Sequence, residues 1–161
     1  MDYLFFVDVQ PEFAKDSYGK KVYQRLLKFE QKMLPYFTVI APVYKNKTNP
    51  NMHRLLQWSE MQDIANLQFK AHYVYEHSGY AIREYPKFRP NDKVVIVGFD
   101  TDACVLATCF DLFDLGVNFQ ILADGCWSSG GRSMHKYGLA VMRRQFGRAL
   151  DTTTKLEDFM F

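Results

Sequence analysis

The feature that most constrains this sequence is the stretch 94–107, in which an apolar run leads through a short turn into a helical pattern. Residues 94–97 are all apolar and Gly98 follows them, which is typical of a strand buried on both faces of a parallel sheet. Cys104 lies in the first turn of the predicted helix, at the edge of the sheet where open α/β folds bind ligands. Its thiol is therefore either a reactive group, favoured as a thiolate by the helix dipole, or a small buried core residue. Position alone leaves both interpretations open.

The composition indicates which classes of partner to expect. A chain of 161 residues suits one domain with a substantial core. The net charge of +2 creates no field that would attract nucleic acid or an anionic membrane, so the expected partner is a small-molecule substrate or another copy of the chain. Three cysteines without a CxxC pair fit a reducing compartment, and the first residues lack the pattern of a signal peptide. We therefore expect a cytoplasmic protein.

Strand and helix patterns alternate along the chain. Short apolar runs predict strands at 3–9, 37–44, 71–75, 94–97, 117–122 and 148–150. Apolar residues at helical spacing predict helices at 18–34, at 52–67 in one or two pieces, from Cys104 to a glycine cap at Gly116, and up to Phe146, before a terminal turn at 156–158. This alternation predicts a single α/β domain over 1–161, with a doubly wound, mostly parallel six-stranded sheet in the order 3-2-1-4-5-6 and helices on both faces. The first and fourth strands are then neighbours, so Asp8 and Cys104 share one crevice.

Three motifs in chain order carry a resemblance to a known family. They are residues 6–10 (FVDVQ), residues 97–105 (VGFDTDACV) with Ala107 and Thr108 after them, and residues 122–125 (LADG) with Ser128 and Ser129 downstream. With these motifs the sequence resembles the isochorismatase-like cysteine hydrolases, a family that includes nicotinamidases and N-carbamoylsarcosine amidohydrolase. The cysteine motif is the most specific of the three.

The resemblance implies hydrolysis of a small amide or related carbonyl compound by an Asp, Lys and Cys triad. Cys104 would attack the carbonyl carbon, and Asp8 would take up the thiol proton and pass it to the leaving amine. The backbone N–H groups of Asp100 and Cys104 would form the oxyanion hole, beside a cis peptide bond between Phe99 and Asp100. Members of the family usually self-associate, so a homo-oligomer is expected.

The sequence departs from the family at the lysine of the triad. The family has this lysine at the end of the third strand, where the segment 74–81 (VYEHSGYA) places Glu76. Three interpretations are open: Lys45 or another cation reaches the site, Glu76 acts as a second carboxylate that shares a proton, or catalysis is lost and the crevice only binds a small ligand. A shifted alignment would instead bring Lys70 or Lys87 to this position.

The missing lysine has a predicted electrostatic consequence for the thiol. If no cation replaces the lysine, only the helix dipole, worth about 0.3–1 kcal/mol, would offset the repulsion between a Cys104 thiolate and its neighbouring carboxylates. These carboxylates are Asp8, Glu76, Asp100 and Asp102. We therefore predict a thiol pKa at or above the ordinary value of roughly 8.5, and weak hydrolysis near neutral pH unless Lys45 or another cation takes the place of the lysine.

The histidines predict neither a metal site nor another cofactor. Nicotinamidases bind a metal through an Asp-x-His-x-x-x-His-like segment after the second strand, and here this region contains only His53. His72 and His77 flank the third strand without the spacing of metal ligands, and His135 is interpreted as structural. We therefore predict a site without metal.

Aromatic side chains and the other cysteines complete the predicted site. Aromatic residues make up 16% of the chain, and Phe13, Trp58 and Tyr80 are predicted to line the crevice, where they would favour a flat or apolar substrate. Cys109 and Cys126 are interpreted as packing residues, so a thiol redox function is not favoured.

Overall fold

Six parallel strands form the centre of the molecule in the computed structural model, which describes residues 1–45, 49–58 and 67–153. The strands are β1 (Asp2–Val7), β2 (Thr38–Tyr44), β3 (Tyr73–His77), β4 (Lys93–Phe99), β5 (Asn118–Trp127) and β6 (Leu150–Asp151). Their order is β3-β2-β1-β4-β5-β6, and every neighbouring pair is parallel. The predicted fold class and strand order are therefore confirmed.

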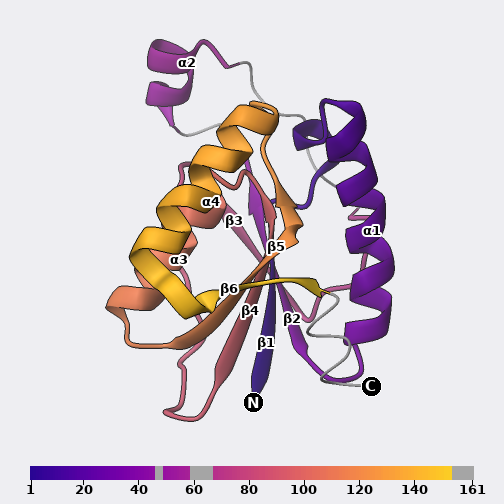
Figure 1. Cartoon of the computed structure of the whole chain (residues 1–161), viewed down its shortest axis with the longest axis vertical. Helices are drawn as coiled ribbons and strands as arrows, with labels where there is room; N and C mark the ends of the chain where they lie inside the picture. Colours follow the sequence, from indigo (N-terminus) through magenta and orange to yellow (C-terminus); the bar gives the residue numbers. More distant parts are fainter. Residues whose placement is uncertain (46–48, 59–66, 154–161) are drawn as a thin grey trace.

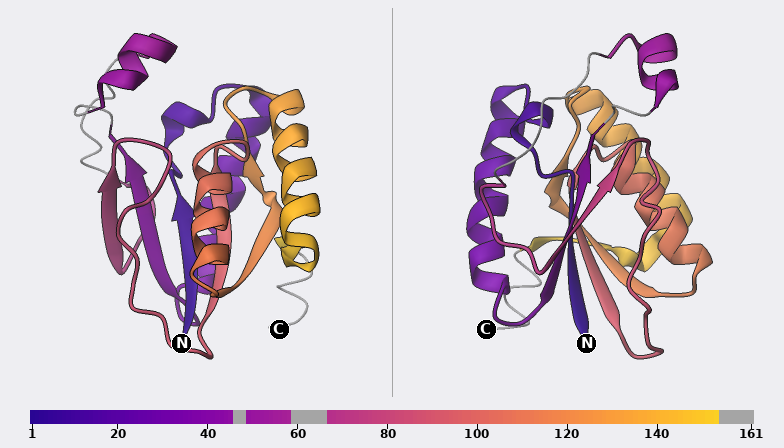
Figure 2. Two further views of the ribbon diagram at one scale, coloured as in Figure 1. Left: turned by 90° about the vertical axis from the view of Figure 1, so that its left-hand side faces the viewer. Right: turned by 180° about the vertical axis from the view of Figure 1, so that it is seen from behind.

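Helices cover both faces of this sheet (Figures 1 and 2). Helix α1 (Ser17–Met33) packs on one face, and α3 (Cys104–Asp114) and α4 (Arg132–Phe146) pack on the other. Helix α2 (Pro50–Leu56) lies beyond the carboxyl ends of the strands, and the single-turn 3-10 helices are η1 (Pro11–Phe13) and η2 (Gly147–Ala149). No described helix has the length and hydrophobicity that crossing a membrane requires.

Strand β1 shows why both faces need a cover. Leu4 and Phe6 belong to the core on the α1 side, and Phe5 and Val7 belong to the core on the α3 and α4 side. Successive side chains of a strand point to opposite faces, and all four of these are fully buried. Burial of each large apolar side chain stabilises the fold by about 1.5–3 kcal/mol. Removing either layer of helices would expose these side chains to water and lose that stabilisation.

The segment 78–92 between β3 and β4 contains neither helix nor strand, and no element was predicted for most of it. Its Ile82, Tyr85 and Phe88 pack into the core on the α3 and α4 side. The ring centroids of Phe88 and Tyr3 lie 5.4 Å apart. The Tyr85 hydroxyl donates a 2.7 Å hydrogen bond to Asp111 on α3. An irregular but anchored segment therefore covers part of this sheet face in place of a helix.

The element boundaries differ from prediction mainly in β3 and β5. Strand β3 runs from Tyr73 to His77 rather than over 71–75, because its register pairs His77 with Tyr44 at the end of β2. Strand β5 continues to Trp127 through the LADG motif, at which the sequence pattern predicts its end, with a register shift opposite β4. Gly125 permits this path, since a Cβ there would lie 2.7 Å from a Val97 methyl group.

Two smaller corrections concern the ends of predicted elements. The final strand is Leu150–Asp151 rather than 148–150, because η2 includes the two residues before it. Helix α2 stops at Leu56, where Gln57 takes a left-handed conformation with φ 56°. The rest of the helix predicted up to residue 67 lies largely outside the described residues, as does the terminal turn at 156–158.

Candidate active site

Asp8 follows the last residue of β1 and lies at the carboxyl edge of the sheet. Its backbone has a positive φ of 48°, a conformation that aspartate tolerates better than most residues, and its N–H donates to the carbonyl of Pro42. The side chain is fully buried. The turn of the chain after β1 therefore buries a carboxylate at the carboxyl edge of the sheet, the edge at which the sequence predicts it.

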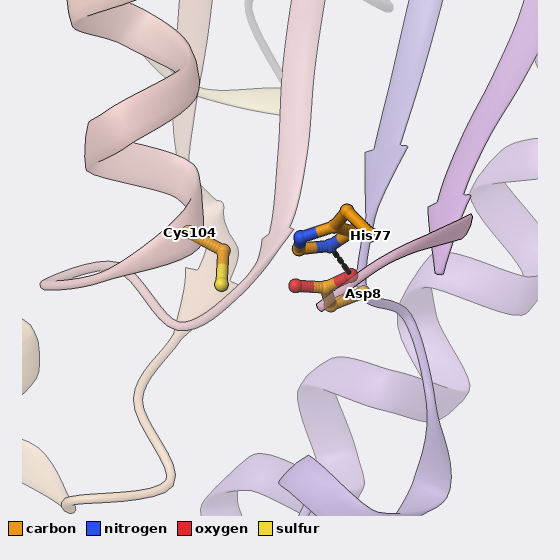
Figure 3. Close-up of side chains that lie close together, drawn as sticks. All are labelled: Asp8, His77 and Cys104. Atoms are coloured by element: carbon orange, nitrogen blue, oxygen red, sulfur yellow. Dashed lines mark hydrogen bonds and ion pairs between the residues drawn. The ribbon is translucent and has the colours of Figure 1, made fainter. Parts of the chain in front are cut away.

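His77, the last residue of β3, contacts this carboxylate directly. Its Nε2 lies 2.6 Å from Asp8 Oδ1, and its Nδ1 lies 2.9 Å from the carbonyl oxygen of Gly79 (Figure 3). Since a carbonyl oxygen only accepts, Nδ1 carries a hydrogen and donates it to Gly79. The hydrogen bond at Nε2 then contains one proton that the imidazole and the carboxyl group share.

The pKa values of this pair are shifted by burial and by each other. Burial raises the pKa of Asp8, and the hydrogen bond from His77 acts against that rise. Burial acts to lower the pKa of His77, but the hydrogen bond to Asp8 and its charge outweigh burial, so the pKa lies above its ordinary value. Both pKa values are raised, so the pair tends to keep the proton that it shares. A protonated His77 can supply the positive charge that the missing lysine would have supplied.

The placement of Glu76 beside Asp8 is corrected by the structure. The side chain of Glu76 is exposed, whereas that of His77 is buried. Neighbouring residues of a strand point to opposite faces, so a shift of one residue exchanges the glutamate for the histidine. His77 lacks the spacing of metal ligands, so the sequence marks it as a site residue only by its position next to Glu76 at the strand end.

The side chain that the structure places in contact with Asp8 is that of His77, and not that of Lys70 or Lys87. Lys70 and Lys87 have exposed side chains. Lys45 is half-buried, and its backbone N–H donates a 2.8 Å hydrogen bond to the carbonyl of His77. The hydrogen-bond partner of Asp8 therefore comes from β3 itself.

Cys104 is the first residue of α3 and faces the same carboxylate. Its side chain is buried, and Sγ lies 3.8 Å from the carbonyl oxygen of Gly79, to which the thiol donates a weak hydrogen bond. Donor atoms of Asp8, His77 and Cys104 all lie within 4.8 Å of one another. Figure 3 shows the second carboxylate oxygen of Asp8 pointing toward the sulfur, with the first bound to His77. Asp8 therefore lies between the imidazole and the thiol.

The surroundings of Cys104 hold it as a neutral thiol. Burial raises its pKa well above the ordinary value, and the negative charges of Asp8, Asp100 and Asp102 raise it further. This direction agrees with the expectation from the sequence, and Asp8, Asp100 and Asp102 are among the carboxylates that cause it. A thiol in this setting becomes a nucleophile only when a neighbouring base accepts its proton, and Asp8 is in position to do so.

The turn between β4 and α3 is fixed by hydrogen bonds from the loop after β5. The Asp100 carboxylate accepts hydrogen bonds from the backbone and hydroxyl of Ser129, at 2.7 and 2.6 Å, and Asp102 accepts one from Ser128 at 2.6 Å. Burial raises the pKa of Asp100 to about 6, despite the opposing hydrogen bonds from Ser129. The downstream serines of the third sequence motif therefore hold the turn that carries Cys104.

The peptide bond between Phe99 and Asp100 in this turn is cis, as the resemblance predicted. The N–H of Cys104 is at the first position of α3, where backbone N–H groups have no intrahelical acceptor. Such an N–H can serve as one donor to an oxyanion, and the N–H of Asp100 remains the predicted second donor.

An aromatic group adjoins His77 on the β2 side. The centroid of the Tyr44 ring lies 5.8 Å from the ring centroid of His77 and 5.8 Å from that of Phe13. It lies 6.1 Å from the ring centroid of Trp58. Gln10 fixes Tyr44 by accepting from its backbone N–H at 2.7 Å and donating to its carbonyl at 3.1 Å. Sequence reasoning named Phe13 and Trp58 but missed Tyr44, which joins them to the site.

Tyr80 lies near the thiol of Cys104. It is 45% exposed, and its pKa is raised by partial burial and by the charges of Cys104, Asp102 and Asp100. It is therefore the aromatic residue of the predicted set that is both close to Cys104 and accessible from solvent.

Among the described residues, Asp8, His77 and Cys104 form the one group of at least three side chains that could hold a metal ion. His53 is exposed on α2 and is not part of this group. His135 instead forms a hydrogen bond with the turn between β4 and α3, where its Nδ1 lies 2.7 Å from the Thr101 hydroxyl. The side chains that could hold a metal ion therefore differ from the segment around His53 that the sequence comparison with nicotinamidases points to.

Comparison with known proteins identifies the fold that carries this site. The model of the isochorismatase domain family matches residues 75–154. A crystal structure of an isochorismatase-like hydrolase from Alkaliphilus metalliredigens aligns over 99% of both chains, with a TM-score of 0.78 and 15% identity. The chain has the isochorismatase-like hydrolase fold.

Two solved amidases share the isochorismatase-like fold. A nicotinamidase from Bacillus subtilis aligns over 93% of this chain and 98% of its own, with a TM-score of 0.74 and 14% identity. The N-carbamoylsarcosine amidase from Thermoplasma acidophilum aligns over 94% of this chain and 95% of its own, with a TM-score of 0.73 and 17% identity. No curated protein sequence matches the chain. At these identities the comparisons show the fold alone. A reaction for this chain has to be argued from the residues at the carboxyl edge of its own sheet.

Proposed function

We propose that the protein is an isochorismatase-like cysteine hydrolase that cleaves the C–N bond of a small amide or related carbonyl compound. The observation that carries this proposal is the buried Asp8 carboxylate, which has His77 on one oxygen and faces the Cys104 thiol with the other. A base, its charge partner and a nucleophile thus meet at the carboxyl edge of a parallel sheet, where this class of fold binds its ligands.

The geometry supports a two-step reaction. Asp8 accepts the thiol proton while Sγ forms a bond to the carbonyl carbon, and the N–H groups of Asp100 and Cys104 stabilise the resulting oxyanion. The C–N bond then breaks, and Asp8 returns the proton to the amine, which leaves as ammonia or a small amine. Water, deprotonated by Asp8, attacks the thioester and releases the carboxylic acid and the free thiol.

His77 acts in this scheme as a positioning residue. Its hydrogen bond fixes the Asp8 carboxylate, and its positive charge offsets the negative charge that remains on the site after the proton leaves Cys104. We assign substrate contacts to Tyr80 and to the group of Phe13, Tyr44 and Trp58, whose rings would favour a flat or apolar acyl group.

A second candidate function is binding without turnover. The deep burial of Cys104 and the carboxylates that raise its pKa favour it, because both oppose formation of the thiolate. In this alternative the same crevice binds a small carbonyl compound and the covalent step does not occur.

A panel of small aliphatic and aromatic amides separates these functions. We expect the wild type to release ammonia from at least one of them and Cys104→Ala to release none above background. Binding of the same compounds by both proteins, measured calorimetrically, with turnover in neither would contradict the hydrolase and support the binding protein. The assays contain a chelator and a reducing agent so that the thiol is free.

His77 provides a test of the charge argument. Replacing it by glutamine should lower kcat about 10–100-fold with little change in KM, since a hydrogen bond to a charged group contributes about 1.5–3 kcal/mol. His77→Lys, which restores a cation, should recover more activity than glutamine does. The control is Glu76→Gln, on the neighbouring exposed residue, which should retain wild-type activity. Equal losses in the glutamine and lysine variants of His77, or a large loss in Glu76→Gln, would reject this role.

Thiol labelling tests the accessibility of Cys104 without a substrate. Its side chain is 6% exposed, compared with 0% for Cys109 and 1% for Cys126. A limiting amount of a small alkylating reagent on the native protein, followed by peptide mapping, should therefore modify Cys104 first. Earlier modification of either of the other cysteines would contradict the assignment of the nucleophile.

A further inference from the structure

We propose that Asp8, His77 and Cys104 also bind a zinc ion, and that this ion inhibits the enzyme by occupying the thiolate. Metal binding follows from the geometry alone, whereas the inhibition rests on the proposed hydrolase function. The three residues bring together a carboxylate oxygen, an imidazole nitrogen and a sulfur, which are the donor types that zinc takes in proteins.

The distances between the donor atoms are short enough for small side-chain movements to bring all three onto one metal ion. The three donor atoms lie within 4.8 Å of one another. Zinc holds its ligands at about 2.0–2.3 Å, so donors of a tetrahedral site are separated by roughly 3.3–3.8 Å. Shifts of about one ångström or less in these side chains would bring them to bonding distance. Such shifts need no movement of β1, β3 or α3 as units.

The imidazole is already oriented as a metal ligand. Nδ1 of His77 donates to the carbonyl of Gly79, which leaves Nε2 directed at Asp8 and the centre of the group. Histidines that bind metals generally donate their other ring N–H to a carbonyl or carboxylate in this way, which fixes both tautomer and ring orientation. The second layer of contacts that a metal site needs is therefore present for His77.

Asp8 supplies an independent observation. Its Oδ2 is buried in a fully inaccessible residue, and among the described residues the Cys104 thiol is the group that acts on it, without the geometry of an ordinary hydrogen bond. A buried oxygen of this kind costs free energy unless a donor or a cation is bound to it. Because Oδ2 faces Cys104 (Figure 3), a cation between the two would satisfy both groups.

The binding step exchanges two protons for the metal. The thiol of Cys104 loses one proton to solvent, and the hydrogen-bonded pair of Asp8 and His77 loses the proton that it shares. Sulfur then forms a bond to Zn²⁺, Nε2 of neutral His77 donates its lone pair, and Asp8 binds as a carboxylate. A water molecule or a substrate oxygen can take the fourth position. With its electron pair bound to the ion, the sulfur cannot attack a carbonyl carbon, and Asp8 cannot act as the base.

Cobalt provides a spectroscopic test on the whole, reduced and chelator-treated protein. Co²⁺ should bind with one ion per chain and produce the intense near-ultraviolet band of a thiolate bound to cobalt, and Zn²⁺ should displace it. The band should be absent in Cys104→Ser, and affinity should fall at least 10-fold in Asp8→Asn and in His77→Gln. The controls His53→Ala and Cys126→Ala should keep both the band and the affinity. No thiolate band in the wild type, or a band that persists in Cys104→Ser, would overturn the site.

Two further readouts separate the site from the function. Stoichiometric Zn²⁺ should slow alkylation of Cys104 at least 10-fold, and a chelator should restore it, whether or not the protein hydrolyses amides. If an amide is hydrolysed, Zn²⁺ should reduce the rate in proportion to occupancy. Protection and the cobalt band without any amidase activity would support the metal site and reject the hydrolase, whereas amidase activity unaffected by bound metal would reject the inhibition.

Discussion

In the Asp8→Asn variant, kcat for the best amide is expected to fall about 10³–10⁴-fold, because an asparagine cannot take the thiol proton or return it to the amine. The substitution keeps the size and shape of the side chain. Its amide group can still donate to Nε2 of His77, whose Nδ1 is hydrogen-bonded to Gly79. The loss should therefore appear in turnover and not in folding, which circular dichroism and thermal unfolding would verify.

The double variant Asp8→Asn with Cys104→Ser makes this test sharper. Residues that act as a unit lose most of their rate with the first substitution, so the second should reduce kcat by less than about 10-fold more. Additive losses would show that the two side chains act independently. A single Asp8→Asn variant that keeps more than about a tenth of the wild-type kcat would show that another group accepts the proton.

The second large effect is expected at Gly98, in β4 beside β1. Gly98→Ala should lower the free energy of unfolding by more than about 4 kcal/mol, or prevent folding altogether, a size typical of severe backbone clashes. A Cβ at this position would lie 1.9 Å from the carbonyl oxygen of Val7, and Gly98 has a φ of 132° that side chains rarely permit. The clash is with backbone at the register pair that precedes Asp8, so rotation of a side chain cannot relieve it.

Gly116, which follows α3, is the matched control for this prediction. It also has a positive φ, 69°, but a Cβ there meets no atom within 4 Å. Gly116→Ala should therefore cost only about 1 kcal/mol, the price of the left-handed conformation alone. Denaturant unfolding of the two variants compares them directly, and similar losses in both would show that the close approach of β1 and β4 is not what requires Gly98.

The order and type of the elements were predictable because they depend on local patterns. The apolar run 94–97, buried on both faces in β4, and the helical spacing of 18–34, observed as α1, fix a strand and a helix without reference to distant residues. Parallel strands joined by helices then leave few possible orders, and the predicted one is observed. Single-domain organisation, self-association and a cytoplasmic location stay predictions.

The register of β3 was not predictable in the same way. This strand lies at the edge of the sheet, and all its residues but His77 are exposed or half-buried, so no alternation of apolar and polar residues marks its faces. Without that pattern, register is specified by pairing with β2, where Tyr44 meets His77. A shift of one residue was enough to assign Glu76 where the structure has His77.

The sequence by itself determined that Asp8 and Cys104 would share one edge of the sheet, since each directly follows or starts an element whose period and direction are local properties. Only the tertiary structure decided which side chain from β3 completes the site, that Tyr44 joins Phe13 and Trp58 to it, and that an oxygen of Asp8 faces the sulfur. These features depend on contacts between residues that are far apart along the chain, such as Asp8 and His77, whose sequence separation is 69. Periodicity describes how one element presents its faces, but the pairing of separate elements sets which faces meet.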